Sequence, residues 1–251
     1  MESSQIGLFV IFFICRLVIG SFLEVVIYRV PRKISIIKPG SYCPSCNGKI
    51  AFYDNIPLIS YIILRGRCRN CKVRISYKTF VIEILTGLLF VLNYFFFDLS
   101  IQTIIGIIFS SILIAVSFID IDLRIIPNTI VIPFTIVGLA LNIYLNPIKW
   151  WVPLAFSAGA FTFMLIINLI YPKGMGMGDV KLSLMVGAFL VKSVIAGLFL
   201  GFLAGAIFGI AVIIKKRKMR QTIPFGPFIS IGSIIALFWG DNILKWYTSF
   251  F

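Results

Sequence analysis

The sequence contains no histidine, and only nine of its 251 residues are Asp or Glu. The missing imidazole excludes a Ser-His-Asp triad, a Ser-His dyad, a Cys-His pair and an HExxH zinc hydrolase, because each of these sites needs one. Charged residues of all kinds make up 13% of the chain. Any hydrolytic chemistry must therefore rest on carboxylates or on other groups.

Apolar residues dominate what remains: 60% of the chain is hydrophobic and the mean hydropathy is +1.05. Long apolar stretches recur along the whole chain, which predicts an all-α polytopic membrane protein with about eight transmembrane helices. The stretch Val180 to Val191 is short for a crossing helix, so it either crosses or is re-entrant. The predicted spans are Ile6–Ile27, Thr79–Phe97, Ile101–Ile119, Thr129–Leu145, Trp150–Tyr171, Val180–Val191, Ser193–Ile214 and Phe225–Trp246.

Basic residues are concentrated in the connectors between the spans. The net charge is +14, and 11 of the 23 Lys and Arg residues lie between Arg29 and Lys78. This placement is explained by the positive-inside rule, by which Lys and Arg accumulate on the cytoplasmic side, and by contact with anionic membrane lipid. It argues against a nucleic-acid partner. With the segment 28–78 inside, about nineteen basic residues lie inside and three outside, which predicts that both termini lie outside.

Two CxxC pairs lie in the same basic segment, and each can form one knuckle of a tetrahedral four-thiolate site. Reduced thiols in a cytoplasmic loop predict a structural zinc ion, although four reduced cysteines without a metal stay an alternative. Cys15 stands apart and is interpreted as a small buried hydrophobe. The predicted zinc ligands are Cys43, Cys46, Cys68 and Cys71.

Three of the few carboxylates, Asp120, Asp122 and Asp179, fall at the predicted cytoplasmic ends of apolar spans. A carboxylate at such a place is costly and is a candidate functional group. Two carboxylates brought close together can share one proton, so that one activates a water molecule and the other donates to a substrate carbonyl. This arrangement hydrolyses a peptide without histidine or metal.

Asp179 follows the glycine-rich sequence GMGMG. We expect Gly176 and Gly178 to let the backbone approach the carboxylate and to adopt φ values closed to other residues. The alternative is that Asp179 is only the N-cap of a helix that begins at Val180. For Asp122, the more conservative interpretation is a solvated interface residue near Arg124.

Several motifs together resemble bacterial prepilin peptidases, also called type IV leader peptidases. GSFLEVVIYRVP at Gly20 to Pro31 is followed by SYCPSC, YDNIPLISY, GRCRNC and VIEILTG, in the order and spacing of that family. FIDIDLRIIPNTIVIP at Phe118 to Pro133 resembles the family's first aspartate motif, and GMGMGDVKL at Gly174 to Leu182 resembles the second. IPFGPF at Ile223 to Phe228 matches a further signature, so the resemblance covers nearly the whole chain.

The resemblance implies a bifunctional enzyme of the bacterial inner membrane whose active site faces the cytoplasm. Such an enzyme cleaves the basic leader of prepilin or pseudopilin precursors after a glycine, and then methylates the new N-terminus with S-adenosylmethionine. By motif, Asp120 and Asp179 are the catalytic aspartates, and Asp122 occupies an acidic but noncatalytic position. Other GxGD proteases, such as the presenilin kind, share the dyad chemistry but do not explain the CxxC pairs or IPFGPF.

The N-terminal end departs from the family pattern, since Glu24 replaces the usual Asn and KTF replaces the usual YP before Val-x-Glu. No glycine-rich Rossmann turn is present, so the methyl donor needs a site of another design. Arg16, Glu24 and Glu83 near the cysteine segment are candidates, and a buried ion pair is the alternative.

The domain organisation follows from these assignments. We expect a first transmembrane helix at residues 1–27, a cytoplasmic zinc-binding region of the methyltransferase type at 28–78, and a transmembrane aspartyl peptidase domain at 79–251. Two other classes of protein stay open. A nonenzymatic zinc-bearing membrane adaptor would tolerate loss of both aspartates. A proton-coupled transporter would need carboxylates deep in the spans and repeat symmetry, and neither is visible in the sequence.

Overall fold

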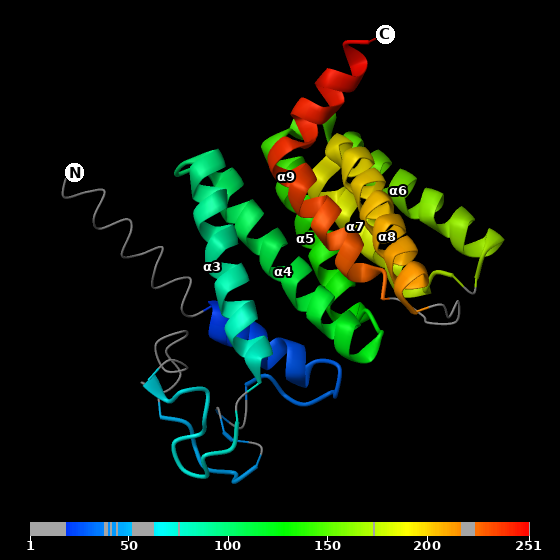
Figure 1. Cartoon of the computed structure of the whole chain (residues 1–251). Coiled ribbons are helices and arrows are strands. Elements are labelled where there is room, and N and C mark those ends of the chain that lie inside the picture. The colour runs from blue at the N-terminus through cyan, green and yellow to red at the C-terminus, as the bar shows by residue number, and fades with distance from the viewer. Residues whose placement is uncertain are drawn as a thin grey trace. The chain divides into compact units, whose positions relative to one another are not determined.

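The structure of the chain, a computed structural model, describes residues 19–37, 40, 42–43, 45–51, 63–74, 76–172, 174–216 and 224–250. Within these ranges the chain is helical, and β-structure is limited to two isolated bridges (Figure 1). The all-α prediction is therefore confirmed for the part that the structure describes. The chain divides into two compact units, Met1–Thr103 and Ile104–Phe251.

The first unit opens with a helix at residues 19–29. The rest of the predicted first span, and with it Cys15 and Arg16, lies outside the described residues. The side chain of Arg29 is 6% exposed and ends this helix by donating hydrogen bonds to the carbonyls of Ser35 and Gly40, at 3.0 and 3.1 Å. The guanidinium thereby satisfies backbone acceptors of a segment that has no regular secondary structure.

Two tight knuckles follow, and each is closed by one isolated bridge. The bridges pair Tyr42 with Lys49 and Arg67 with Arg74. Apart from the bridges and residue 63, which is helical, the described parts of this segment form turns and irregular backbone. This is expected for a region that lacks an apolar core. Helix α3, Tyr77–Phe97, then begins after Ser76, whose hydroxyl accepts a hydrogen bond from the backbone N–H of Lys78. The YDNIPLISY motif lies outside the described residues.

The second unit is a helical bundle with α7 at its centre (Figure 1). Ten of the 14 residues of α7 are buried, and α7 packs against α5 and α6, whereas α8 packs mainly on α9. The rings of Phe109 and Phe189 stack with centroids 4.9 Å apart and join α4 to α7. The helices are α4 Ile101–Leu123, α5 Asn128–Leu145, α6 Trp151–Ile170, α7 Met177–Leu190, α8 Val194–Lys216 and α9 Gly226–Thr248.

Small and polar residues let α7 approach its neighbours closely, as in other membrane helix pairs. A Cβ at Gly187 would lie 2.7 Å from the Cα of Ser157, so only glycine permits this crossing with α6. The hydroxyl of Ser157 donates to the carbonyl of Leu184 at 2.7 Å, and the amide of Asn142 donates to the carbonyl of Ala188 at 2.9 Å. These bonds fix the depth of α7 in the bundle.

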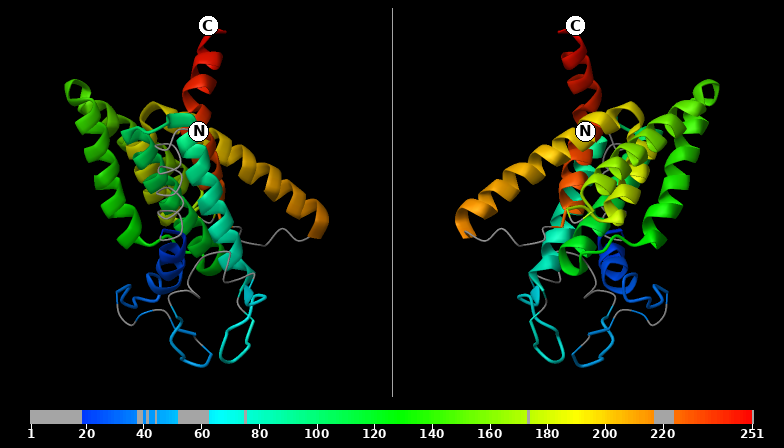
Figure 2. Two further views of the ribbon diagram at one scale, coloured as in Figure 1. Left: turned by 90° about the vertical axis from the view of Figure 1, so that its left-hand side faces the viewer. Right: turned by 90° about the vertical axis from the view of Figure 1, so that its right-hand side faces the viewer.

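Six stretches among the described residues are long and apolar enough to cross a membrane. One of them, Met177–Lys215, contains both α7 and α8, which are joined by a short 3-10 turn at Val191–Ser193. Figure 2 shows α8, in gold to orange, descending away from α7 after this turn. The 14 residues of α7 span about 21 Å, less than the roughly 30 Å of a bilayer core, so the eight-span count stays a prediction.

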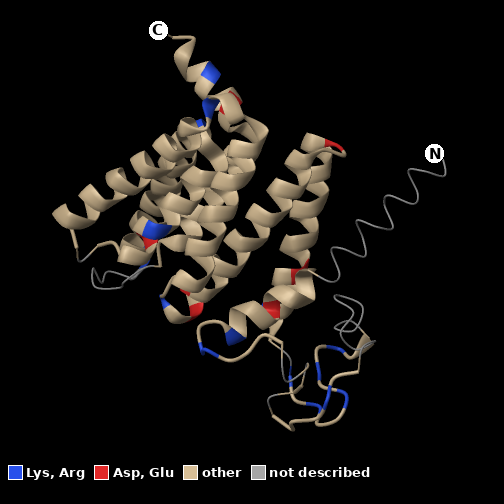
Figure 3. Cartoon of the chain, turned by 180° about the vertical axis from the view of Figure 1, so that it is seen from behind, with Lys and Arg blue, Asp and Glu red and all other residues tan. Residues whose placement is uncertain are grey.

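Most of the charged residues of the second unit lie toward the ends of its helices (Figure 3), although Asp241 lies seven residues before the end of α9. Asp120 is three residues from the end of α4, and Asp179 is the third residue of α7. The middle of each helix is apolar or carries small polar groups. Asp120 and Asp179 therefore lie near helix ends and not in the middle of their helices.

Candidate active site

The turn before α7 holds Asp179 in the first turn of that helix. The backbone N–H of Gly176 donates to Oδ2 of Asp179 at 3.1 Å, and the N–H of Asp179 donates back to the carbonyl of Gly176. The amide of Asn168, at the end of α6, anchors the turn by donating to the carbonyl of Met175 at 2.7 Å. The carboxylate thus satisfies a donor at the helix N-terminus, where the helix dipole favours negative charge.

Two expectations about this turn were wrong in detail. The helix begins at Met177 rather than Val180, so Asp179 is a residue of the first turn and not the N-cap. Gly176 has a φ of −84°, and Gly178 is helical, so neither adopts a conformation closed to other residues. Gly178 is instead closely packed, because a Cβ there would lie 3.0 Å from the Cβ of Ile126.

Asp120 is held by a residue far away in the sequence. The backbone N–H of Gly226, the first residue of α9, donates to Oδ2 of Asp120 at 2.9 Å across 106 positions. The predicted span ends at Ile119, but α4 continues through Asp120 to Leu123. Asp120 therefore lies within the last turn of its helix, and it does not cap that helix.

The structure brings Asp120 and Asp179 together, since the two carboxylates are close enough to interact electrostatically. The side chains of both residues are almost completely buried, with 6% and 7% exposed respectively. In each carboxylate, Oδ2 accepts a glycine N–H, which leaves Oδ1 for water or substrate. Asp122, two residues further along α4, is exposed.

This arrangement suits acid-base hydrolysis. Two buried carboxylates at close range cannot readily ionise together, and such a pair can hold one shared proton. The ionised member can take a proton from water while the protonated member donates one to a carbonyl. Lys181 lies nearby in sequence, but its Nζ donates to Oδ1 of Asn128 at 3.1 Å and ties α7 to α5.

The four predicted zinc ligands also come together. The Sγ atoms of all four cysteines lie within 4.8 Å of one another, and those of Cys43 and Cys71 are 3.8 Å apart. A tetrahedral zinc ion with Zn–S bonds of about 2.3 Å needs S–S separations of about 3.8 Å. The four thiols therefore fit a closed structural site with no ligand position left for water.

Backbone donors in the first knuckle prepare it for a metal. The N–H groups of Cys46 and then Ser45 point at the sulfur of Cys43 and lower the pKa of that thiol to about 6. Thiolates, not thiols, ligate zinc. The second knuckle repeats the fold of the first, with the N–H of Cys68 donating to the carbonyl of Val73 as that of Cys43 donates to Gly48, both at 2.9 Å.

Two of the candidate methyl-donor residues meet inside the first unit. Glu24 interacts electrostatically with Glu83 of α3 and accepts a hydrogen bond from Thr79. The Oε1 atom of Glu24 is buried and has no hydrogen-bond partner among the described residues. A buried carboxylate oxygen without a donor is costly, and a cationic group would satisfy it.

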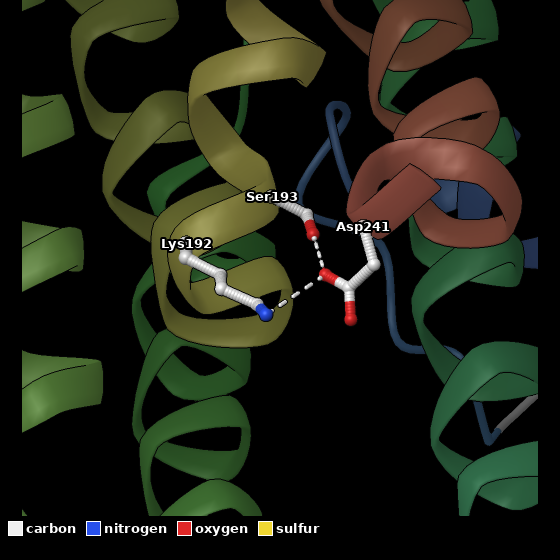
Figure 4. Close-up of polar contacts among 3 residues, drawn as sticks. All are labelled: Lys192, Ser193 and Asp241. Atoms are coloured by element: carbon white, nitrogen blue, oxygen red, sulfur yellow. Dashed lines mark hydrogen bonds and ion pairs between the residues drawn. The ribbon is translucent and has the colours of Figure 1, made fainter. Parts of the chain in front are cut away.

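A second polar cluster lies past the other end of α7. The hydroxyl of Ser193 donates to Oδ1 of Asp241 at 2.8 Å, and Nζ of Lys192 lies 3.5 Å from the same oxygen (Figure 4). The charged side chains of Lys192 and Asp241 are more than half exposed, so their pairing contributes at most about 1 kcal/mol. We interpret it as a clasp between the turn after α7 and helix α9.

Sequence reasoning missed the roles of Gly226 and Asn168 at the site. Gly226 belongs to IPFGPF, which was noted as a motif without a role. The signal that points to it is a glycine before a proline at the start of a helix, where backbone N–H groups have no partner within the helix. Asn168 carries no comparable signal, because it is one polar residue near the end of an apolar span.

Comparison with known families gives two matches that together cover most of the chain. Residues 14–97 match the model of the bacterial peptidase A24 N-terminal domain, and residues 107–210 match that of the type IV leader peptidase family. The first match contains the cysteine cluster, and the second contains Asp120 and Asp179. No solved structure matches the chain significantly.

Curated relatives match over almost their whole length. A prepilin leader peptidase/N-methyltransferase from Bacillus subtilis is 36% identical over 240 residues, which cover 94% of this chain and 96% of the relative. The protein of the same name from Aeromonas salmonicida is 34% identical over 277 residues, or 96% and 94% of the two chains. The Legionella pneumophila protein is 33% identical, with coverage of 93% and 92%.

The cysteine geometry predicts that the purified full chain carries about one zinc ion. Cys43→Ser or Cys71→Ser should lower the zinc content strongly, because each removes one of the four ligands. Cys15→Ser, the matched control outside the two CxxC pairs, should leave it unchanged. Elemental analysis by plasma mass spectrometry measures the zinc-to-protein ratio. Absence of zinc from wild type, or equal zinc in all variants, would contradict the assignment.

Proposed function

The chain belongs to the type IV leader peptidase family, and we propose that it cleaves the leader peptide of type IV prepilin-like precursors with Asp120 and Asp179. It is an enzyme, a protease that also carries N-methyltransferase activity, and the resemblance seen in the motifs is confirmed. The observation that supports the aspartate pair is its geometry: two buried carboxylates from different helices interact, each held by one glycine N–H.

In the proposed reaction, the pair holds one proton between two carboxylates. A water molecule bound between the free oxygens gives a proton to the ionised carboxylate and attacks the scissile carbonyl. The protonated carboxylate donates its proton to the carbonyl oxygen and so stabilises the developing charge. The proton taken from water then passes to the leaving amine as the C–N bond breaks, and one hydroxyl of the tetrahedral intermediate returns a proton to the other carboxylate, which restores the singly protonated pair. The glycine N–H groups keep both carboxylates in place throughout.

The position of the pair agrees with the chemistry of the substrate. A precursor with a basic leader and an apolar helix presents its cleavage site at the membrane surface. Asp120 lies in the last turn of α4 and Asp179 in the first turn of α7. We place both on the cytoplasmic side of the inner membrane, with the basic segment 28–78 on the same side, as the distribution of Lys and Arg favours.

The same placement argues against the other classes. A proton-coupled transporter would need carboxylates along the length of its helices, whereas this pair lies at helix ends. A role as a zinc-bearing adaptor does not explain why two carboxyl groups are buried close to each other. In our proposal zinc at the four cysteines is structural and replaces the apolar core that the segment 28–78 lacks. Residues 79–251 carry the peptidase.

For methyl transfer, we assign the methyl donor to the first unit. S-adenosylmethionine supplies a methyl group carried on a positively charged sulfur. The buried Oε1 of Glu24 fits such a cation, and a cation there would offset the repulsion between the carboxylates of Glu24 and Glu83. Glu24 and Glu83 would hold and orient the cationic donor. The acceptor is the new N-terminal amine of the cleaved precursor, which must be uncharged to accept the methyl group.

The dyad is tested by cleavage of a prepilin-like precursor in membranes that carry wild type or single variants in equal amounts. Asp120→Asn and Asp179→Asn should each lower the cleavage rate about a thousandfold or more, because the pair works as a unit. Asp122→Asn is the matched control on the same turn of α4 and should cut normally. Normal cleavage by either of the first two variants would refute the mechanism.

The methyl-donor assignment is tested by calorimetric binding of S-adenosylmethionine to the purified full chain. Glu24→Gln and Glu83→Gln should each weaken binding about tenfold to a hundredfold, as expected for loss of a charged partner. Asp98→Asn, at the exposed end of α3, is the control and should bind as wild type. The assignment fails if both Gln variants bind the donor with wild-type affinity. Leader cleavage should persist in all three variants.

A further inference from the structure

The start of α9 offers one backbone donor to the active site. Gly226 is the first residue of α9, and such residues have N–H groups without acceptors in their own helix. The next residue, Pro227, has no N–H, and the N–H groups of Phe228 and Ile229 donate to the carbonyl of Phe225. The N–H of Gly226 is therefore free to reach another helix, and it donates to Oδ2 of Asp120 at 2.9 Å.

A larger residue at this position would push against the carboxylate of Asp120. A Cβ at residue 226 would lie 2.8 Å from Oδ2 and 3.3 Å from Cγ of Asp120. Gly226 is buried, and its φ is not among the positive values of the described residues. The need for glycine thus comes from the carboxylate itself rather than from the backbone conformation.

The donor is held by aromatic packing on α8 that does not include the aspartates. The ring of Phe225 lies 5.2 Å from that of Phe202, and the ring of Phe228 lies 5.3 Å from that of Phe208, centroid to centroid. Further along, Gly232 packs directly on the backbone of Gly197 and Gly201. These contacts fix the start of α9, so the amide of Gly226 is aimed before any substrate arrives.

From these contacts we infer that Gly226 is a positioning residue for the peptidase reaction, whose backbone N–H orients Asp120 and favours its ionised form. The dipole of α9 acts in the same direction, because the helix N-terminus carries partial positive charge. Gly176 donates to Asp179 in the same way, but the two residues are only three positions apart in the chain. Gly226 belongs to a different helix from Asp120, so the orientation of Asp120 depends on where α9 is placed. This inference rests on the proposed role of Asp120 in cleavage.

The test compares Gly226→Ala with Gly209→Ala, a control in α8 whose added Cβ meets no atom within 4 Å. In the precursor cleavage assay, Gly226→Ala should lower kcat/KM about tenfold to a hundredfold, as expected for a lost hydrogen bond to a charged group. The acidic limb of its pH–rate profile should move to higher pH, because the displaced carboxylate loses the donor that favours its ionised form. Gly209→Ala should match wild type in both respects.

A second pair of variants covers the case in which Gly226→Ala fails to fold. Replacing Gly226 by glycolic acid in cell-free synthesis turns the amide into an ester, which removes the N–H and adds no atom. The same replacement at Gly209 removes a hydrogen bond within α8 and is the control. The inference predicts the rate loss and the pH shift for the ester at 226 and not for the ester at 209.

The inference is overturned if the ester at 226 cuts with the rate and the pH profile of wild type while Asp120→Asn is inactive. It is also overturned if the rate falls only in proportion to folded protein, with the acidic limb unmoved. Activity of Asp120→Asn itself would instead refute the proposed function.

Discussion

The burial of two carboxyl groups near the ends of apolar helices is the constraint on which the rest of the second unit depends. An isolated carboxylate in an apolar medium is strongly disfavoured, so each one needs a donor nearby. The chain supplies those donors from its own backbone, at the N-termini of α7 and α9. Because the donors sit on helices, every contact that places a helix also places a carboxylate.

The packing of the bundle can be understood in those terms. Gly187 and Ser157 set the crossing of α7 with α6, and Asn142 ties the far end of α7 to α5. These interactions use small residues and hydrogen bonds because apolar burial drives little association between helices in lipid. The cysteine segment of the first unit must be stabilised in another way, since it has few apolar residues to bury. Four converging thiols give it a centre that a metal can complete.

Most of the helices and both clusters could be predicted from sequence because their signals are local. Apolar length located α3, α5, α6, α8 and α9 to within about two residues, and CxxC spacing identified the four cysteines that meet. The motifs also pointed to Asp120 and Asp179, and their role as a catalytic pair stays a prediction. The start of α7 was misplaced because GMGMG is a weak helix former, and the helix there is held by tertiary contacts.

The role of Gly226 could not be derived in the same way. Its partner is 106 residues away, and no pattern of spacing or composition connects them. The expected positive φ values at Gly176 and Gly178 failed for a related reason. Glycine can be required by space as well as by conformation, and only the packed structure tells the two apart. The Glu24 oxygen that has no hydrogen-bond partner among the described residues is likewise visible only once α3 is in place.

The central claim is that Asp120 and Asp179 share one site, and cross-linking tests it most directly. Cysteines placed at 120 and 179 in the full chain, in membranes, should be joined by a short bis-methanethiosulfonate reagent in high yield. A 120/241 pair is the control, because residue 241 lies about 22 Å along α9 from Gly226. A cross-link in the first pair and not in the second is the predicted result. No cross-link between 120 and 179, in protein that is folded and labelled at both sites, would contradict the account.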